Sequence, residues 1–169
     1  ASMTKLIECP RDAMQGIHDF IPTNIKAEYI NLLLQVGFDT IDFGSFVSEK
    51  AIPQLKDTIE VLNKLDLGEG KTKLLAIVAN LRGVEEAIIH PQISYLGFPF
   101  SVSETFQRRN TNAGIETSLL LVEKLINNCE KSNKKAVIYL SMGFGNPYGD
   151  PWSNEIVEHW TNELTKIGA

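Results

Sequence analysis

The sequence predicts an α/β fold built from parallel βα units, and three observations support this prediction. Short apolar runs rich in β-branched residues alternate along the chain with longer segments of helical periodicity. Glycines, Gly37 and Gly168, follow two of the helical segments, where helices commonly end. An Asp150-Pro151 pair precedes the last helical segment and has the composition of a helix start. We therefore expect five βα units covered by helices.

The units follow one another in chain order. We expect strands over residues 5–9, 38–43, 73–79, 93–98 and 135–141, and helices over 23–36, 53–65, 83–89, 114–133 and 152–167. In the fourth helix, apolar residues recur every three or four positions from Ile115 to Cys129, which predicts a stripe facing the sheet and makes Cys129 a core residue. In the last helix, Asp150 is the expected N-cap and Pro151 the first helical residue.

Composition excludes several functional classes. Hydrophobic residues make up 43% and charged residues 22% of the chain, and no apolar run approaches the roughly 18 residues of a membrane span. The net charge of −5 gives no excess of basic residues of the kind that indicates nucleic-acid binding. Two widely separated cysteines form neither a disulfide framework nor a zinc motif, which favours a cytoplasmic protein. We expect one domain over residues 1–169, with residues 1–2 a tag remnant ahead of Met3.

The first strand is followed by a charged segment, Glu8 to Gln15, that suggests chemistry. In α/β proteins, side chains at the carboxyl ends of strands form the sites. Arg11 offers a permanently charged planar fork for a carboxylate or an enolate oxygen, and Asp12 offers a hard oxygen ligand for Mg²⁺ or Mn²⁺. A plain surface salt bridge is the alternative interpretation of this Arg-Asp pair.

Further motifs extend along the chain. The second strand continues into Ser-Phe-Val-Ser, residues 45–48, followed by Lys50, Pro53, Gln54 and Asp57. Later motifs are Ala-Asn-Leu-Arg-Gly at 79–83, Ser-Glu at 103–104 with Phe106 and Asn110, and Tyr-Leu-Ser at 139–141 with Gly145, Pro147 and Tyr148. With the Arg-Asp pair, they make the chain resemble the hydroxymethylglutaryl-CoA lyase family of metal-dependent barrel enzymes.

The resemblance implies a parallel (β/α)8 TIM barrel that is incomplete here. Such a barrel takes roughly 250 residues, and the chain has 169, enough for about five βα units. The family's His-x-His metal ligands, a further Asn ligand and a glycine-rich loop with the catalytic cysteine find no match in the sequence. The alternative is an open flavodoxin-like doubly wound sheet, which would place the first strand inside the sheet.

The resemblance also assigns expected roles near the first two strands. Asp12 corresponds to the family's metal-ligating aspartate, and Arg11 to the arginine that stabilises the enolate-like oxygen. Asp42 stands where the family usually has a glutamate, and the shorter carboxylate can still pair with Arg11. Gln15 is expected to orient the substrate or Arg11, or to be a plain surface residue.

Three residues at later strand ends complete the expected site. Asn80, Tyr139 and Ser141 could contact the acyl or pantetheine groups of a substrate, although interior packing or loop capping would equally explain each of them.

The function implied is cleavage of 3-hydroxy-3-methylglutaryl-CoA to acetyl-CoA and acetoacetate by metal-assisted retro-Claisen chemistry. The expected partners are an acyl-CoA substrate, a divalent Mg²⁺ or Mn²⁺ ion, and either further copies of the chain in a homo-oligomer or a complementing C-terminal fragment. Alone, the chain is expected to be inactive. The alternatives are a related isopropylmalate or homocitrate synthase-type enzyme or aldolase, or a non-catalytic α/β fragment acting as an interaction module.

Overall fold

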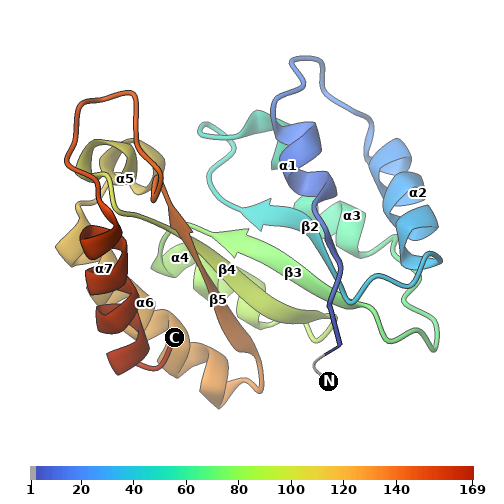
Figure 1. Ribbon diagram of the computed structural model, residues 1–169. Coiled ribbons are helices and arrows are strands. Elements are labelled where there is room, and N and C mark those ends of the chain that lie inside the picture. Colours follow the sequence, from blue (N-terminus) through green and yellow to red (C-terminus); the bar gives the residue numbers. More distant parts are fainter. Residues whose placement is uncertain (1–2) are drawn as a thin grey trace. The chain divides into compact units, whose positions relative to one another are not determined.

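Five strands form one parallel sheet in the computed structural model, which describes residues 3–169 (Figure 1). The strands are β1 (Ile7–Glu8), β2 (Thr40–Phe46), β3 (Lys73–Val78), β4 (Ile93–Ser101) and β5 (Lys135–Ser141). Each predicted strand is present; β5 has the predicted ends, and the other four differ at one or both ends. The expected tag remnant, residues 1–2, lies outside the described residues.

The strand order distinguishes between the two predicted folds. The order is β1-β2-β3-β4-β5, so every strand lies next to its neighbour in the sequence and β1 is at the edge. A flavodoxin-like sheet would have the order 2-1-3-4-5, with the first strand inside. The prediction of an incomplete TIM barrel is therefore confirmed.

Seven α-helices and one 3₁₀ turn connect the strands within the described residues. They are α1 (Pro10–Gln15), α2 (Thr23–Leu34), η1 (Pro53–Leu55), α3 (Thr58–Leu62), α4 (Leu81–Ile88), α5 (Glu104–Thr111), α6 (Ile115–Lys131) and α7 (Asn154–Lys166). The short helices α1 and α5 were not predicted. Over residues 3–169, no helix has the length and apolar character needed to cross a membrane.

The chain divides into two compact units. The first contains residues 3–77 and 90–95, and its core includes Ile30, Ile41 and Leu74, where α2 packs on α3 and β2. The second contains residues 78–89 and 96–169. The single domain proposed over 1–169 stays a prediction.

In the second unit, α6 packs on β5 and α4 and carries the predicted apolar stripe. Ile115, Val122 and Ile126 are buried, and Cys129 is buried with them. Burial raises the pKa of the Cys129 thiol to about 11, so the thiol is protonated at neutral pH. Cys129 is a core residue, as its position in the stripe predicts.

The predicted start of the last helix is wrong. Helix α7 begins at Asn154, and its N-cap is Ser153, whose Oγ accepts the backbone N–H of Ile156 at 3.1 Å. Asp150 instead accepts a hydrogen bond from Ser103 Oγ at 2.6 Å. It also accepts the backbone N–H of Thr105 at 2.9 Å. Asp150 therefore fastens the loop before α7 to the start of α5 rather than capping its own helix.

Candidate active site

The carboxyl end of β1 brings Arg11 to Asp42. Glu8, the last residue of β1, pairs with Ile41, so Asp42 lies one residue beyond the β1–β2 ladder. Helix α1 begins two residues after Glu8 with Pro10 at its first position, which places Arg11 in the first turn. Arg11 Nε donates to both carboxylate oxygens of Asp42 at 3.1 Å, and Nη2 donates to Oδ2 at 2.8 Å. This bidentate arrangement fixes the plane of the guanidinium group.

The Arg11–Asp42 pair is largely removed from water. The Asp42 side chain is 1% exposed and that of Arg11 is 15% exposed. Burial raises the pKa of Asp42 above its ordinary value, and the hydrogen bonds and positive charge of Arg11 offset this only in part. Burial, with Asp42 nearby, also raises the pKa of the Cys9 thiol. Cys9 is therefore in its neutral form beside the pair, not a thiolate nucleophile.

Gln15 and Asp12 complete the surroundings of Arg11. Gln15, one helical turn along α1, accepts a hydrogen bond from Arg11 Nη1 at 2.8 Å. Asp12 Oδ1 lies 3.6 Å from the same nitrogen, and its side chain is 75% exposed. The hydrogen bond is the contact that an orienting role of Gln15 requires, and the role itself stays a prediction.

Asp42 differs in one respect from its predicted place. The second strand was expected to end at residue 43, but β2 runs to Phe46, so Asp42 is the third of seven strand residues. It still lies at the carboxyl end of the paired region, because β1 pairs through only two residues. Arg11 has room beside Asp42 because β1 is short, and not because β2 ends there.

The residues present do not form a complete metal site. The exposed carboxylate of Asp12 suits a hard divalent ion as one ligand. Within residues 3–169, however, no group of three or more His, Cys, Asp or Glu residues could hold a metal ion. The metal-ligand role of Asp12 therefore stays a prediction.

The three other candidates lie in the second unit and have structural contacts. Asn80 caps α4, because its Oδ1 accepts the backbone N–H of Gly83 at 2.9 Å. Ser141 is the last residue of β5, and its Oγ donates to the carbonyl oxygen of Phe100 at 3.4 Å. Tyr139 is half-buried on the same strand. Their proposed substrate contacts stay predictions.

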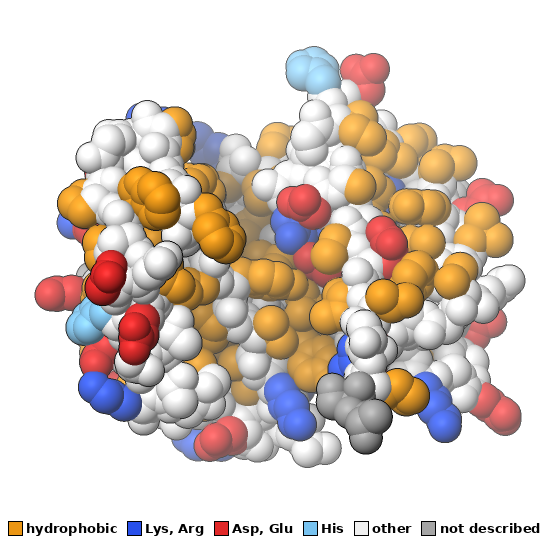
Figure 2. Space-filling model, in the orientation of Figure 1, with side chains coloured by type: hydrophobic (Ala, Val, Ile, Leu, Met, Phe, Trp, Pro, Cys, Tyr) orange, Lys and Arg blue, Asp and Glu red, His pale blue; other side chains and the backbone are white. Residues whose placement is uncertain are grey.

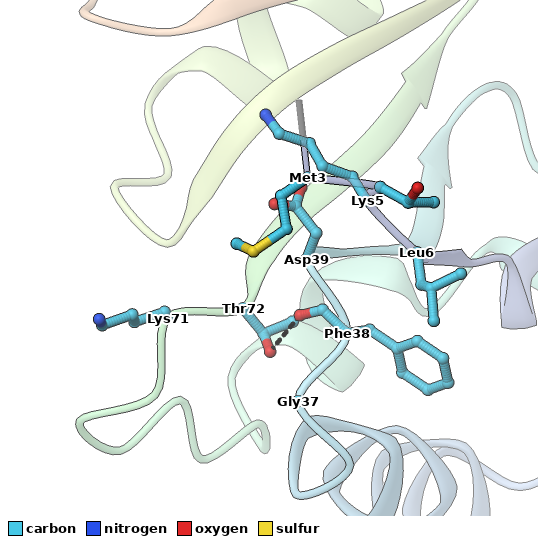
Figure 3. Close-up of a pocket in the computed structure, with 9 residues that line it drawn as sticks. Met3, Lys5, Leu6, Gly37, Phe38, Asp39, Lys71 and Thr72 are labelled. Carbon is cyan, nitrogen blue, oxygen red and sulfur yellow. Dashed lines mark hydrogen bonds between the residues drawn. The ribbon is translucent and has the colours of Figure 1, made fainter. Parts of the chain in front are cut away.

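Two of the cavities in the first unit lie at opposite ends of the strands. One, of about 440 Å³, is lined by Gln15 and adjoins the Arg11 cluster. The other, of about 360 Å³, lies at the amino ends of the strands (Figure 3). Its residues include Leu6 and Asp39, which pair where the β1–β2 ladder begins, and Thr72, whose Oγ1 donates to Phe38 O at 2.7 Å. Sites in parallel α/β folds form at the carboxyl ends, which favours the first cavity.

Sequence reasoning missed Gln54, which lines the cavity of about 440 Å³ together with Gln15. Gln54 was quoted as part of a motif, but no role was given to it. Its side-chain amide holds the loop that follows Gln15. In the sequence, Gln54 is a polar residue next to Pro53, and no periodicity distinguishes it from a turn residue.

Comparison with curated proteins shows which enzymes the chain is similar to. It is 34% identical to the cytoplasmic 3-hydroxy-3-methylglutaryl-CoA lyase of Rattus norvegicus over 98% of this chain and 48% of the rat protein. It is 37% identical to hydroxymethylglutaryl-CoA lyase YngG of Bacillus subtilis over 94% of this chain and 52% of that protein. No family model matches the sequence. The chain thus spans about half the length of the curated relatives it matches.

Solved structures agree with the sequence matches. The HMG-CoA lyase of Bacillus subtilis superimposes with a TM-score of 0.90 at 34% identity, over 97% of this chain and 55% of that one. An HMG-CoA lyase of Acinetobacter baumannii, solved with coenzyme A and 3-methylmalate, gives a TM-score of 0.89 at 27% identity over 97% and 53% of the two chains. These matches confirm the family resemblance that the motifs predicted.

Proposed function

Because the chain is homologous to the hydroxymethylglutaryl-CoA lyases over about half of their length, we propose that it carries the arginine-containing part of a carbon–carbon lyase site. The substrate proposed is 3-hydroxy-3-methylglutaryl-CoA. One observation carries the proposal: Arg11, held by Asp42 and Gln15, lies at the carboxyl end of β1. This is where barrel enzymes place their catalytic groups.

Arg11 would act on the charge that develops during cleavage. The reaction removes the proton of the C3 hydroxyl, breaks the bond between C2 and C3, and gives acetoacetate and the enolate of acetyl-CoA, which then takes up a proton. A fixed guanidinium beside the enolate oxygen stabilises the transition state, because its charge needs no reorientation as the bond breaks. Asp42 and Gln15 hold Arg11 in that orientation.

Asp12 would contribute one oxygen ligand to a divalent Mg²⁺ or Mn²⁺ ion. Such an ion, when bound, polarises the C3 oxygen of the substrate. The remaining ligands, the base and the proton donor are expected from the half of the relatives that this chain does not span. The isolated chain is therefore proposed to be inactive.

A complementing polypeptide is the partner proposed, and the first unit has a surface suited to it. Strand β1 ends the sheet order, so one of its edges has no strand neighbour among residues 3–169. Helix α2 and the residues after it expose Ile25, Tyr29, Leu32 and Val36, spaced along one side. Figure 2 shows hydrophobic side chains gathered over this part of the molecule. Association of two copies of the chain is the competing outcome.

Complementation tests the proposal. The chain is mixed with the C-terminal half of the Bacillus subtilis relative, and acetoacetate release from 3-hydroxy-3-methylglutaryl-CoA is measured with Mg²⁺ or Mn²⁺. We expect turnover only in the mixture, and its loss in Arg11→Ala. Arg82→Ala is the control, since Arg82 is an exposed arginine that pairs with Glu86 on its own helix.

A stable complex without turnover would contradict the proposal, and so would full activity of the Arg11→Ala variant. Turnover with acetyl-CoA and a 2-oxo acid instead would favour the synthase-type alternative. Sedimentation of the chain alone at micromolar concentration separates self-association from complementation.

The cytoplasm is the proposed location. Relatives named cytoplasmic are among the most similar, and others are named mitochondrial. Fractionation of the native cells decides between these two compartments.

A further inference from the structure

One glutamine holds the loop that joins α1 to α2, residues 16–22. Gln54 Nε2 donates to the carbonyl oxygens of Ile17 and Asp19, both at 2.9 Å. Its Oε1 accepts the backbone N–H of Ile21 at 2.9 Å. A single buried side chain thus satisfies three backbone groups of a segment that is otherwise irregular.

A buried lysine anchors this glutamine. Lys26 Nζ donates a hydrogen bond to the backbone carbonyl oxygen of Gln54. It also donates to Asp57 Oδ1, at 2.7 Å. The other oxygen of Asp57 accepts a hydrogen bond from Thr23 Oγ1 at 2.7 Å. Lys26 Nζ also lies 4.1 Å from the centre of the Phe20 ring, a cation–π contact between α2 and the same loop. Lys26, Gln54 and Asp57 are all buried.

Stability alone is a weak reason for such a network. Burying a lysine–carboxylate pair costs desolvation energy that the attraction between the charges often only balances, and apolar residues of similar size commonly serve as well. What apolar residues cannot do is bind specific backbone oxygens and nitrogens. The network therefore fixes one conformation of the loop.

The loop begins directly after Gln15, the residue whose Oε1 accepts the hydrogen bond from Arg11. Gln15 and Gln54 also line the same cavity of about 440 Å³. Moving the loop would move the last turn of α1, and with it the acceptor that orients the guanidinium.

We propose that Gln54, anchored by Lys26, is a positioning residue for Arg11. It holds the loop after α1, the loop holds Gln15, and Gln15 holds the guanidinium. The importance of this orientation for catalysis rests on the function proposed above for Arg11. The positioning itself is measured on the chain alone, without substrate.

The test compares two buried glutamines. Gln54→Ala removes the proposed positioning residue. Gln107→Ala is the matched control, because Gln107 is also buried, lies in the second unit and also bonds to backbone groups. Its partners are the N–H of Ser101, the carbonyl oxygen of Pro99 and the hydroxyl of Ser118.

The readout is hydrogen exchange followed by NMR. The Arg11 Nη1–H resonance, which belongs to the group that donates to Gln15 and is identified by its loss in Arg11→Lys, is followed together with the backbone amide of Ile21. In Gln54→Ala we expect exchange at both positions to become about tenfold faster or more, beyond the change in global stability. In Gln107→Ala both should change only in proportion to global stability.

Gln54→Glu provides a second variant of the same size, which keeps the acceptor for Ile21 and removes both donors. Unchanged Arg11 Nη1–H exchange in both Gln54 variants would overturn the proposal, as would equal effects from Gln107→Ala. Failure of both Gln54 variants to fold would also count against it, since Gln54 would then serve general stability. A negative complementation assay with the expected exchange result would contradict the lyase proposal alone.

Discussion

Replacing Asp42 by alanine should destabilise the protein far more than replacing Asp12, although both carboxylates face the same guanidinium. Asp42 is almost fully buried and accepts three hydrogen bonds of 2.8 to 3.1 Å from Arg11. Asp12 is exposed and lies 3.6 Å from Nη1 of Arg11. The comparison therefore isolates burial and geometry, because the positive partner is the same.

The size of the effect follows from what each substitution leaves behind. Breaking a buried ion pair by removing one partner costs about 3–5 kcal/mol. Two features lower the expected loss of stability here. Arg11 keeps its hydrogen bond to Gln15. Burial also raises the pKa of Asp42, so the pairing with Arg11 does not fully offset the desolvation of this carboxylate. We expect Asp42→Ala to lower the free energy of unfolding by about 2–4 kcal/mol. Asp12→Ala should lower it by less than about 0.5 kcal/mol, as is usual for exposed pairs.

Urea denaturation at pH 7, followed by tryptophan fluorescence and by circular dichroism, measures both values. The slope of the unfolding free energy with urea should be the same in all three proteins, so that the midpoints compare stability alone. A loss below about 1 kcal/mol for Asp42→Ala, or equal losses for the two variants, would show that the pair does not hold α1 on the sheet.

Three further predictions concern pH and packing. The pKa of Asp42 is raised on folding. The contribution of this carboxyl group to stability is therefore greatest below about pH 4 and is lost as the pH rises through the folded pKa. The difference in unfolding free energy between the unmodified chain and Asp42→Asn should fall over that range. The hydrogen bonds from Ser103 and Thr105 lower the pKa of Asp150, so the corresponding difference for Asp150→Asn should show the opposite trend, decreasing as pH falls through the folded pKa. Gly44→Ala should cost about 1–3 kcal/mol by chemical denaturation, because the new Cβ would lie 2.6 Å from Thr58 Cγ2. Adding Thr58→Ser, which removes that methyl group, should recover part of the loss, and no recovery would refute the steric explanation.

The fold was predictable because long elements have periodic patterns. The stripe on α6, from Ile115 to Cys129, identified both the helix and its buried side. Short elements lack this signal. Helix α1 has six residues, too few to show a period, although Pro10 marks its start. Strand β4 runs through Pro99 to Ser101, whereas a proline normally argues against a strand interior, so its end was placed too early.

The site was predictable only where the chemistry lies in residue type. The family resemblance assigned roles to Arg11, Asp42 and Gln15; the structure brings these three side chains together, and the roles themselves stay predictions. Gln54 could not be found in this way, because its partners are backbone atoms of the residue 16–22 loop, and backbone atoms are the same in every sequence. The N-cap prediction for Asp150 was wrong for a different reason. An Asp-Pro pair is a common helix start, but Asp150 accepts hydrogen bonds from Ser103 and Thr105 instead.

The strand order has a consequence for how the chain folds during synthesis. Because sheet order follows chain order, each strand pairs with one that has already left the ribosome. The first compact unit is not continuous, however, since it includes residues 90–95 as well as 3–77. The pairing that holds Arg11 against Asp42 needs only β1, α1 and β2, so it is available before that unit is complete. Arg11 can therefore pair with Asp42 about fifty residues before the synthesis of residues 90–95, which complete the first unit.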